Sequence, residues 1–433
     1  MKLEEKIKQN IFYPEVYAYP TPRCYRPGKK IDIKQIDFGK NLNLYIHIPF
    51  CRSICAYCGY LKTISNEKMQ SDYIEALCLE IIAYQGILKD KTVNTVHFGG
   101  GTPTLLSVSQ IKEIMDALEI VFPNFKKTAK EISIEATPDS ICKLKVDDYL
   151  LLGFNRFSLG VQTFCPQELL LARRGHQNFD VNEAFKILKA KGVQNIVFDL
   201  MLGIADQTIN SFKSSIDKVI SLRPDTVEIY ALGIMPNTLW KQQKTKYMAN
   251  GDKYACYKLA RDLFLAAGYR QDDYNRYILQ GSGGFLQEDN VFKGESLIGF
   301  GSGARTYTSN INYRNTYSEN NHQGAVLRYI DRIKNRQTSI EDTFLMTRDE
   351  KIRQYAIYNI KKLNLSEFEE KFKTAFESIF GKTVKTLTKH KLARVTKKYF
   401  YLTRDGLIYK DLIAHELYSS STKNIEESYR PTI

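Results

Sequence analysis

Short apolar runs alternate with longer amphipathic stretches along the first half of the chain. In the longer stretches apolar residues recur at helical spacing, as at Ile74, Leu77, Ile81 and Leu88. This pattern predicts strands at 43–47, 95–98, 131–134, 156–160, 195–201 and 226–231, separated by helices at 68–88, 109–121, 140–152, 182–191 and 211–222. Strands that alternate with helices are typical of βαβ units, so we expect a parallel sheet, either a partial barrel or doubly wound.

The alternation stops after about residue 237. A mixed region follows, with a glycine-rich stretch at 281–303, and helical patterns dominate from about residue 342. The segment 399–409 has the pattern of a β-hairpin around Asp405 and Gly406. We therefore expect an N-terminal extension at 1–41, a core at 42–240, an extension of that core at 241–341 and a smaller α+β accessory domain at 342–433.

The composition is that of an ordinary globular protein. The 433 residues are 43% apolar and 25% charged, which excludes a disordered, collagenous or disulfide-stapled chain. No apolar run is long enough to span a membrane, and the charged N-terminus lacks the apolar segment of a signal peptide, so we expect a cytoplasmic protein.

The net charge is +14, and part of this excess is concentrated at 351–410, where 15 basic residues face 5 acidic ones. Such a basic segment can attract nucleic acid or another anion, but a solvated lysine-rich surface is the more common explanation.

Chemically suggestive residues follow the predicted strands. Because the carboxyl ends of parallel strands meet at one rim, residues far apart in sequence should converge there. The residues in question are Cys51, Cys55 and Cys58 after the first strand, Gly99, Gly100 and Gly101 after the second, Glu135 at the end of the third, Gln162 after the fourth, and Asp199 late in the fifth.

Cys51, Cys55 and Cys58 lie three and four residues apart, close enough for their thiolates to turn onto one centre. Three soft ligands suit zinc or an iron–sulfur cluster. A structural zinc site needs a fourth ligand, which His47 or His97 could supply, whereas three cysteines alone suit a cubane with one open iron. Cysteines without any ligand are the third alternative.

The sequence segments around these cysteines resemble those of a known family. Cys-x3-Cys-x2-Cys with Tyr57 before the third cysteine resembles the radical S-adenosylmethionine (SAM) superfamily. Segments 45–51, 98–104, 133–138 and 157–164 further resemble the oxygen-independent coproporphyrinogen III oxidase family, and the match runs from about 44 to 412. That group also contains haem chaperones, haem-degrading methyltransferases and natural-product methylases. The resemblance implies a partial (β/α)6 barrel.

The resemblance also implies roles for single residues. Cys51, Cys55 and Cys58 would hold a [4Fe–4S] cluster whose fourth iron chelates SAM, and reduction would then release a 5′-deoxyadenosyl radical. Gly100 and Gly101 match residues that let the backbone approach the methionyl group of this SAM. Further contacts match Tyr45 and Glu135, and Arg305 follows the late glycine turn of the family, in a place where an apolar residue is usual.

Some members of the family bind a second SAM, which can donate a methyl group. The positions that match its contacts here are Tyr57, Thr102, Gln162, Arg174, Asp199 and Ala231. In this interpretation Arg174 recognises a carboxylate, and Asp199 accepts from ribose or ammonium.

Two departures from the family affect the predicted reaction. Tyr60 stands where coproporphyrinogen oxidases carry a further cysteine, and the segment 289–294 lacks the histidine of the haem chaperones' motif. We therefore predict a radical enzyme that acts on a tetrapyrrole or a similar heteroaromatic ring, with oxidative decarboxylation or haem delivery as alternatives. Its partners would be a small molecule and an electron donor such as flavodoxin or ferredoxin, and nucleic acid is the weakest hypothesis.

Overall fold

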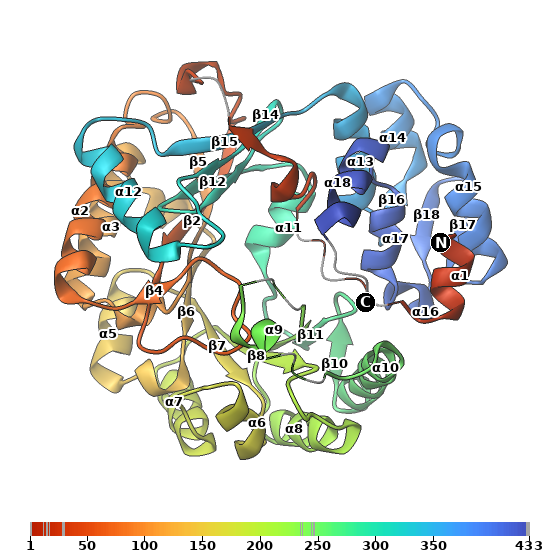
Figure 1. Cartoon of the computed structure of the whole chain (residues 1–433), viewed down its shortest axis with the longest axis horizontal. Coiled ribbons are helices and arrows are strands. Elements are labelled where there is room, and N and C mark those ends of the chain that lie inside the picture. The colour runs from red at the N-terminus through yellow and green to blue at the C-terminus, as the bar shows by residue number, and fades with distance from the viewer. Residues whose placement is uncertain are drawn as a thin grey trace.

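One large sheet organises the chain (Figure 1). The computed structural model describes residues 2–11, 13, 16, 18–27, 31–233, 235, 237–243, 245 and 247–429. Within these residues the sheet has 13 strands in the order β1-β15-β14-β13-β12-β2-β5-β6-β7-β8-β9-β11-β10. Its centre consists of six parallel strands: β2 (Asn41–Ile48), β5 (Thr92–Gly100), β6 (Glu131–Ala136), β7 (Arg156–Gln162), β8 (Asn195–Leu202) and β9 (Thr226–Ala231). The predicted α/β class and parallel sheet are confirmed.

Further strands extend both edges of this parallel centre. A seventh parallel strand, β12 (Ser296–Phe300), pairs with β2 and comes from the glycine-rich stretch, where no strand was predicted. Beyond β12 lie β13 (Arg305–Tyr307), β14 (Ile311–Asn315), β15 (Ile340–Leu345) and β1 (Arg26–Pro27), and beyond β9 lie β11 (Arg276–Leu279) and β10 (Tyr269–Gln271). Segment 241–341 therefore contributes to the central sheet itself.

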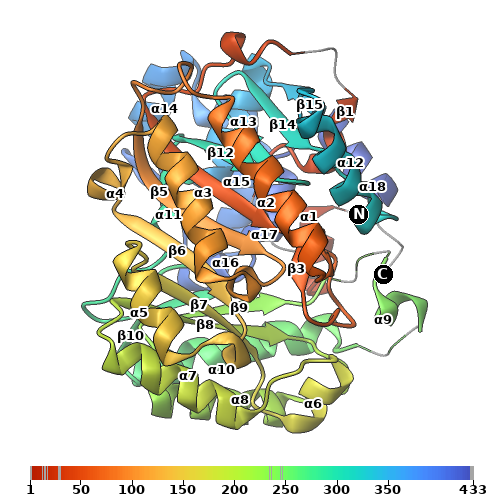
Figure 2. The ribbon, with the colours of Figure 1, turned by 90° about the vertical axis from the view of Figure 1, so that its left-hand side faces the viewer.

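Helices cover the outer face of the sheet (Figure 2). They are α2 (Glu67–Ile82), α3 (Val108–Val121), α5 (Lys143–Leu151), α7 (Asn178–Ala190), α8 (Ile209–Leu222) and α10 (Asn250–Ala266). The side chains of Asn66, Ser107 and Thr208 cap α2, α3 and α8. The helix predicted at 68–88 is too long, because α2 ends at Ile82 and turns lead to Gly86 at φ +83°.

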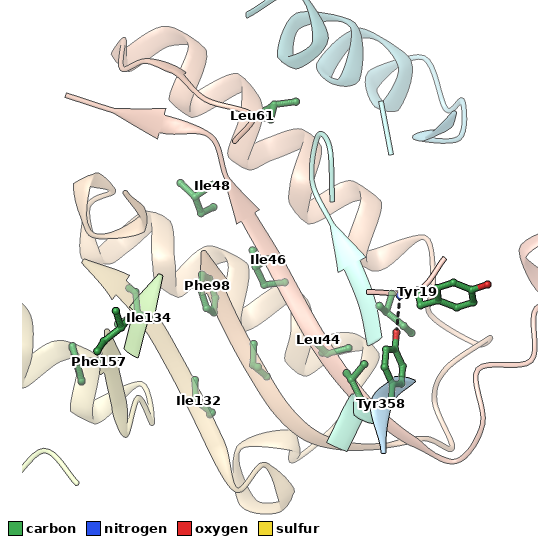
Figure 3. Close-up of a cluster of buried hydrophobic side chains, with 14 of the residues drawn as sticks. Tyr19, Leu44, Ile46, Ile48, Leu61, Phe98, Ile132, Ile134, Phe157 and Tyr358 are labelled. Atoms are coloured by element: carbon green, nitrogen blue, oxygen red, sulfur yellow. Dashed lines mark hydrogen bonds between the residues drawn. The ribbon is translucent and has the colours of Figure 1, made fainter. Parts of the chain in front are cut away.

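The strands place apolar side chains on the face toward these helices. In β2, Leu44, Ile46 and Ile48 are fully buried, and they lie beside Phe98 of β5 in the same layer (Figure 3). Because side chains alternate along a strand, the residues between them point to the opposite, inner face. The inner face is where the predicted site residues of these strands lie.

The C-terminal region has a small sheet of its own. Within the described residues β16 (Lys362–Asn364), β18 (Tyr399–Leu402) and β17 (Ala393–Val395) form three antiparallel strands. The hairpin predicted at 399–409 is wrong, because β18 pairs back with β17 and residues 404–407 form helix α16. The hydroxyl of Thr403 accepts from the amide of Gly406 and caps that helix, so Asp405-Gly406 does not form a strand turn.

Helix α12 (His322–Lys334) lies beside α2 (Figure 1). The remaining elements of the C-terminal region are the helices α13 (Arg348–Tyr358), α14 (Leu365–Phe372), α15 (Phe376–Lys389), α16 (Arg404–Leu407), α17 (Lys410–Glu416) and α18 (Ser420–Tyr429). Shorter elements elsewhere are β3 (Phe50–Cys51), β4 (Thr63–Ile64), α4 (Phe125–Thr128), α6 (Pro166–Leu171), α9 (Leu239–Gln242) and α11 (Leu286–Phe292). No helix among the described residues is both long and apolar enough to cross a membrane.

The N-terminal residues pack against the C-terminal helices. The ammonium of Lys6, in α1 (Leu3–Lys8), lies 2.6 Å from the Glu416 carboxylate, and the amide of Val16 donates to Asp411 at 3.0 Å. The hydroxyl of Tyr19 accepts from the amide of Ser419. The first and last segments of the predicted division are therefore in direct contact, and the boundaries at 41, 240 and 341 stay a prediction.

Candidate active site

The loop that carries the three cysteines follows the carboxyl end of β2. Residues 51–63 form a closed loop, because β3 and β4 pair in parallel at its two ends and the amide of Thr63 donates to the carbonyl of Pro49 at 2.7 Å. Cys55 and Cys58 lie on a turn in which the Cys58 amide bonds the Cys55 carbonyl. All three cysteines are half-buried and none forms a disulfide.

The thiols of this loop lie in a poorly solvated environment. Burial raises the pKa of the Cys51 thiol to about 12, and it raises the pKa of the Cys58 thiol as well. The guanidinium of Arg174 donates to the Cys55 sulfur at 3.5 Å. The Thr102 hydroxyl contacts Cys51. Metal binding would displace the thiol protons and stabilise the thiolates that burial otherwise disfavours.

The glycine turn after β5 runs alongside the cysteine loop. The amides of Gly101 and Thr102 donate to the carbonyls of Ile48 and Phe50, each at 2.8 Å. A Cβ on Gly101 would lie 2.6 Å from the Phe50 oxygen and 3.0 Å from the Cys51 sulfur. Gly100 has φ +118°, and a Cβ there would collide with the His47 ring. Only glycine fits at these two positions, because other protein atoms already occupy the place of each Cβ.

Glu135 is held at the end of β6 by two donors. Its carboxylate accepts from the Gly100 amide at 3.0 Å and from Nε2–H of His97 at 3.1 Å. Burial alone would raise the pKa of Glu135, but His97 and the Gly100 amide outweigh it and hold that pKa below its usual value. The side chain is still 38% exposed, so the carboxylate has room for a ligand.

The two histidines that could complete a zinc site, His47 and His97, already have hydrogen-bond partners at both ring nitrogens. The Tyr45 hydroxyl bonds Nδ1 of His47, and Nε2 of His47 bonds the Leu61 carbonyl, each at 3.0 Å. Burial lowers the pKa of His47 to about 4, so its ring is neutral. In His97, Nδ1 bonds Ser133 at 2.7 Å while Nε2 bonds Glu135. The hypothesis that either histidine completes a zinc site is not supported. Their observed role, which the sequence interpretation missed, is to orient Tyr45 and Glu135.

Gln162, Arg174 and Asp199 gather around Gly160 in β7. Gln162 has φ +67°, and the strand register is irregular between Gly160 and Gln162. A Cβ on Gly160 would lie about equally close to the Gln162 amide (2.9 Å) and the Arg174 guanidinium (3.0 Å). Gly160 also pairs with Asp199 of the next strand. The structure therefore brings these three predicted residues together.

Two polar atoms in this group have no protein partner. The Nε of Arg174 and one carboxylate oxygen of Asp199 are buried without a hydrogen bond, while the other Asp199 oxygen accepts from Ser158 at 2.7 Å. Burial, with the nearby charge of Glu228, raises the pKa of Asp199 to about 8. Buried groups of this kind normally find a partner, so their condition fits a ligand-binding site.

The other predicted contacts occupy separate places on the same rim. Tyr57 lies on the cysteine loop with its ring 5.5 Å from the Trp240 ring. Ala231 ends β9 opposite Leu202. Arg305 begins β13, where its backbone is packed against Gly299. The contacts that these residues make with a ligand stay predictions.

Comparison with known proteins agrees with this geometry. A family model described as the radical SAM superfamily matches residues 45–219. A curated relative, the heme chaperone HemW of Escherichia coli, is 30% identical over 61% of this chain and 69% of its own length. The chain belongs to the radical SAM superfamily. The resemblance drawn from the sequence motifs is thereby confirmed.

Other relatives place it in the coproporphyrinogen oxidase-like part of this superfamily. Heme chaperone HemW of Bacillus subtilis is 29% identical over 84% of this chain and 95% of its own length. Oxygen-independent coproporphyrinogen III oxidase of Pseudomonas aeruginosa is 27% identical over 79% and 77%. The solved structure of Escherichia coli coproporphyrinogen III oxidase (HemN), at 24% identity, covers 93% of this chain and 96% of its own with a TM-score of 0.82, which shows a common fold.

Membership of the radical SAM superfamily implies a [4Fe–4S] cluster and SAM, and the residues present fit the cluster. Cys51, Cys55 and Cys58 offer three soft donors, and neither His47 nor His97 has a ring nitrogen left to coordinate metal. In the described part of the chain no three His, Cys, Asp or Glu side chains form a site for a single metal ion.

The parallel strands form an open, partial barrel, and the inner face of β2, β5 and β6 is polar along its length, a signal that the sequence interpretation did not use. Inward positions in β2, β5 and β6 are Asn43, Tyr45, His47, Thr95, His97, Glu131, Ser133 and Glu135. Parallel strands covered on both faces are usually continuous apolar runs, whereas these strands alternate. Alternation within predicted parallel strands could therefore have identified the inner face as functional.

At the amino end of the barrel the inner charges are paired and covered. Glu228 is 2% exposed, and its carboxylate lies 3.0 Å from Arg156 and 3.3 Å from Arg276. The guanidinium of Arg156 lies 4.2 Å from the centre of the Phe285 ring, just before α11. Burial raises the pKa of Glu228, but the two arginines outweigh this and hold it below its usual value. This end is closed by the protein itself.

Proposed function

We propose that this protein cleaves SAM reductively at a [4Fe–4S] cluster held by Cys51, Cys55 and Cys58, and acts on a tetrapyrrole or a similar heteroaromatic substrate. The observation that supports it best is the contact between the glycine turn and the cysteine loop. At Gly101 the backbone passes so close to Cys51 that a Cβ would lie 3.0 Å from its sulfur. When bound, the cluster supplies the electron that cleaves SAM to a 5′-deoxyadenosyl radical.

The protein's own residues would bind and orient the first SAM. Gly100 and Gly101 match the family's glycines and would present their backbone to its methionyl group. Glu135, fixed by Gly100 and His97, offers a carboxylate to its ammonium or ribose. Tyr45 lies against the His97 ring, with 5.8 Å between ring centres, and limits the space on that side. Cluster ligands and SAM contacts would thus share one rim.

A second SAM is supported by the group around Gly160. Arg174 and Asp199 each leave a buried polar atom without a protein partner, and Gln162 lies beside them. A guanidinium can bind the carboxylate of a second SAM, and Asp199 can bond a ribose hydroxyl or an ammonium group. We therefore favour methyl transfer, with oxidative decarboxylation of a coproporphyrinogen as the alternative, and we place an electron donor such as flavodoxin or ferredoxin and a cytoplasmic location in the same proposal.

The test is anaerobic assembly of the protein with iron and sulfide, followed by dithionite and SAM. We expect 5′-deoxyadenosine from the wild-type chain and none from Cys55→Ala, with Cys78→Ala as the matched control because Cys78 lies on α2, away from the loop. Methyl-labelled SAM with candidate porphyrinogens then separates methyl transfer from release of carbon dioxide. Purified protein that holds zinc without sulfide and refuses cluster assembly would contradict the proposal.

Haem delivery is a second candidate, because several relatives are named heme chaperones. Against it, Asn290 in the segment that aligns with the chaperones' motif is buried on α11 and donates to Asn43 at 3.1 Å. Haem titration of the assembled protein decides between the two. Stoichiometric uptake with a Soret shift would favour delivery, and a flat titration would exclude it.

A further inference from the structure

The chain after β9 crosses over to the cysteine loop. The strap, defined as Met235 and residues 237–243, contacts that loop at three points. A Cβ on Gly59 would lie 2.8 Å from Cβ of Met235. The amide of Trp240 donates to the carbonyl of Ala56 at 3.1 Å, and the Trp240 ring lies 5.5 Å from that of Tyr57. These contacts cover the segment that carries Cys55 and Cys58.

The strap has a small hydrophobic core of its own. Trp240 is the single tryptophan of the chain and is 3% exposed. It packs with a cluster of buried side chains that is separate from the main core and comprises Ala56, Ala172, Ile204, Ala205 and Leu232, with Tyr57 and Met201 at its edge. The amide of Ala56 also donates to the carbonyl of Ala172. Ala56 of the cysteine loop is thus held through both its amide and its carbonyl.

The strap is held at its amino end and by hydrogen bonds within itself. The Thr238 hydroxyl bonds the carbonyl of Met235 at 2.8 Å and caps α9 at the amide of Lys241. The Asn237 side chain donates to the carbonyl of Glu319, beyond β14. The strap follows the end of β9, where the amide of Leu232 donates to the carbonyl of Leu202.

The position of the strap in the sheet explains what it can do. In the sheet order four strands lie between β2 and β9. The loops that follow these two strands are therefore not brought together by strand pairing. Of the predicted second-SAM contacts, Ala231 ends β9, and Asp199 lies on β8 three residues before its end at Leu202. The strap therefore connects the cysteine loop directly to the opposite side of the rim.

We propose that Trp240 is a positioning residue that holds the cysteine loop in the conformation that receives the cluster. Tyr57 lies between two cysteine ligands, so a ring that fixes Tyr57 also limits the motion of Cys55 and Cys58. The inference rests on the proposed function for the identity of the bound group, but the loop restraint can be measured in metal-free protein.

The test compares Trp240→Ala and Trp240→Phe with Phe264→Ala. Phe264 is fully buried on α10 and packs on Tyr269 and Tyr277, away from the loop, so this control reports a general loss of core packing. In metal-free protein we expect the Ala56 amide to exchange about tenfold faster in Trp240→Ala, because a lost ring pair and its burial cost at least about 1.4 kcal/mol locally. Trp240→Phe should stay close to wild type.

In assembled protein, Trp240→Ala should lose iron to a chelator about tenfold faster than wild type, in proportion to the loosened loop. Phe264→Ala should lower the unfolding midpoint without this change. Cluster assembly should also quench the emission of Trp240 in the wild-type chain, because the fluorophore lies beside the ligands.

Each outcome decides the matter. A folded Trp240→Ala protein with wild-type exchange at Ala56 and wild-type iron loss would overturn the role of Trp240. Should this variant not fold, Met235→Ala tests the same strap through its contact with Gly59, since Met235 is 36% exposed and adds little to the core. If the wild-type chain takes up no iron and sulfide, the proposed function fails, while the exchange rates still decide the restraint.

Discussion

The two ends of the barrel differ in how their inner charges are satisfied. Towards the amino end, Arg156, Glu228 and Arg276 are each at most 3% exposed, and both guanidiniums bind the Glu228 carboxylate. At the carboxyl end, Glu135 is 38% exposed, and midway along the strands Asp199, the ladder partner of Glu228, keeps a carboxylate oxygen without a partner. Both ends are polar, so polarity alone does not mark the active site. Exposure does, because the Glu135 side chain is 38% exposed and that of Glu228 only 2%.

Glu228→Gln should produce the largest effect, at the closed end. It removes a buried negative charge and leaves two arginines facing each other, which costs about 3–5 kcal/mol in the free energy of unfolding. Urea denaturation of metal-free protein measures it. Glu288→Gln is the matched control, since Glu288 binds Arg276 at the edge of the network and is 17% exposed, and it should cost less. An unchanged free energy of unfolding with lost SAM cleavage would assign Glu228 to the active site instead.

Glu135→Gln, at the open end, should weaken SAM binding while it changes the free energy of unfolding little. Loss of a charged acceptor costs about 1.5–3 kcal/mol in binding, so SAM affinity should fall about 10- to 100-fold while the protein stays folded. Glu131→Gln is a control on the same strand, because Glu131 bonds the amide of Leu286 at the closed end. Calorimetric titration of SAM into assembled protein compares the two, and equal losses in both variants would remove the distinction between the ends.

The sequence predicted the open end better than the closed one. Cys51, the glycine turn and Glu135 directly follow or end strands with strong local patterns, so topology places them on one rim. Strand β12 was missed because Ser-Leu-Ile-Gly-Phe has a weak local preference, and its place depends on pairing with β2 far away in the sequence.

Contacts between distant segments explain the other errors. Trp240 and Tyr57 are far apart in the sequence and come into contact only in the folded chain, so no local pattern predicts that pair. The hairpin expected around Asp405 fails because the Thr403 hydroxyl caps a helix there while β18 pairs with β17. The sequence shows only that His97 is able to bind a metal. Its two hydrogen bonds, which depend on the fold, show its actual role.

Asp199→Asn should have the smallest effect below about pH 4, where the wild-type carboxyl is protonated in both the folded and the unfolded chain, and it sharpens the comparison through its pH dependence. The folded pKa of Asp199 is about 8, above the ordinary value of 3.8, so the folded protein binds the extra proton. Wild-type stability must then fall as pH rises from about 4 through 8, by at most about 1.4 kcal/mol for each pH unit. Asn cannot ionise, so the variant should gain stability relative to wild type between pH 5 and pH 9, measured by urea denaturation of metal-free protein. A constant difference across this range would mean that Asp199 is ionised and already paired, like its ladder partner Glu228.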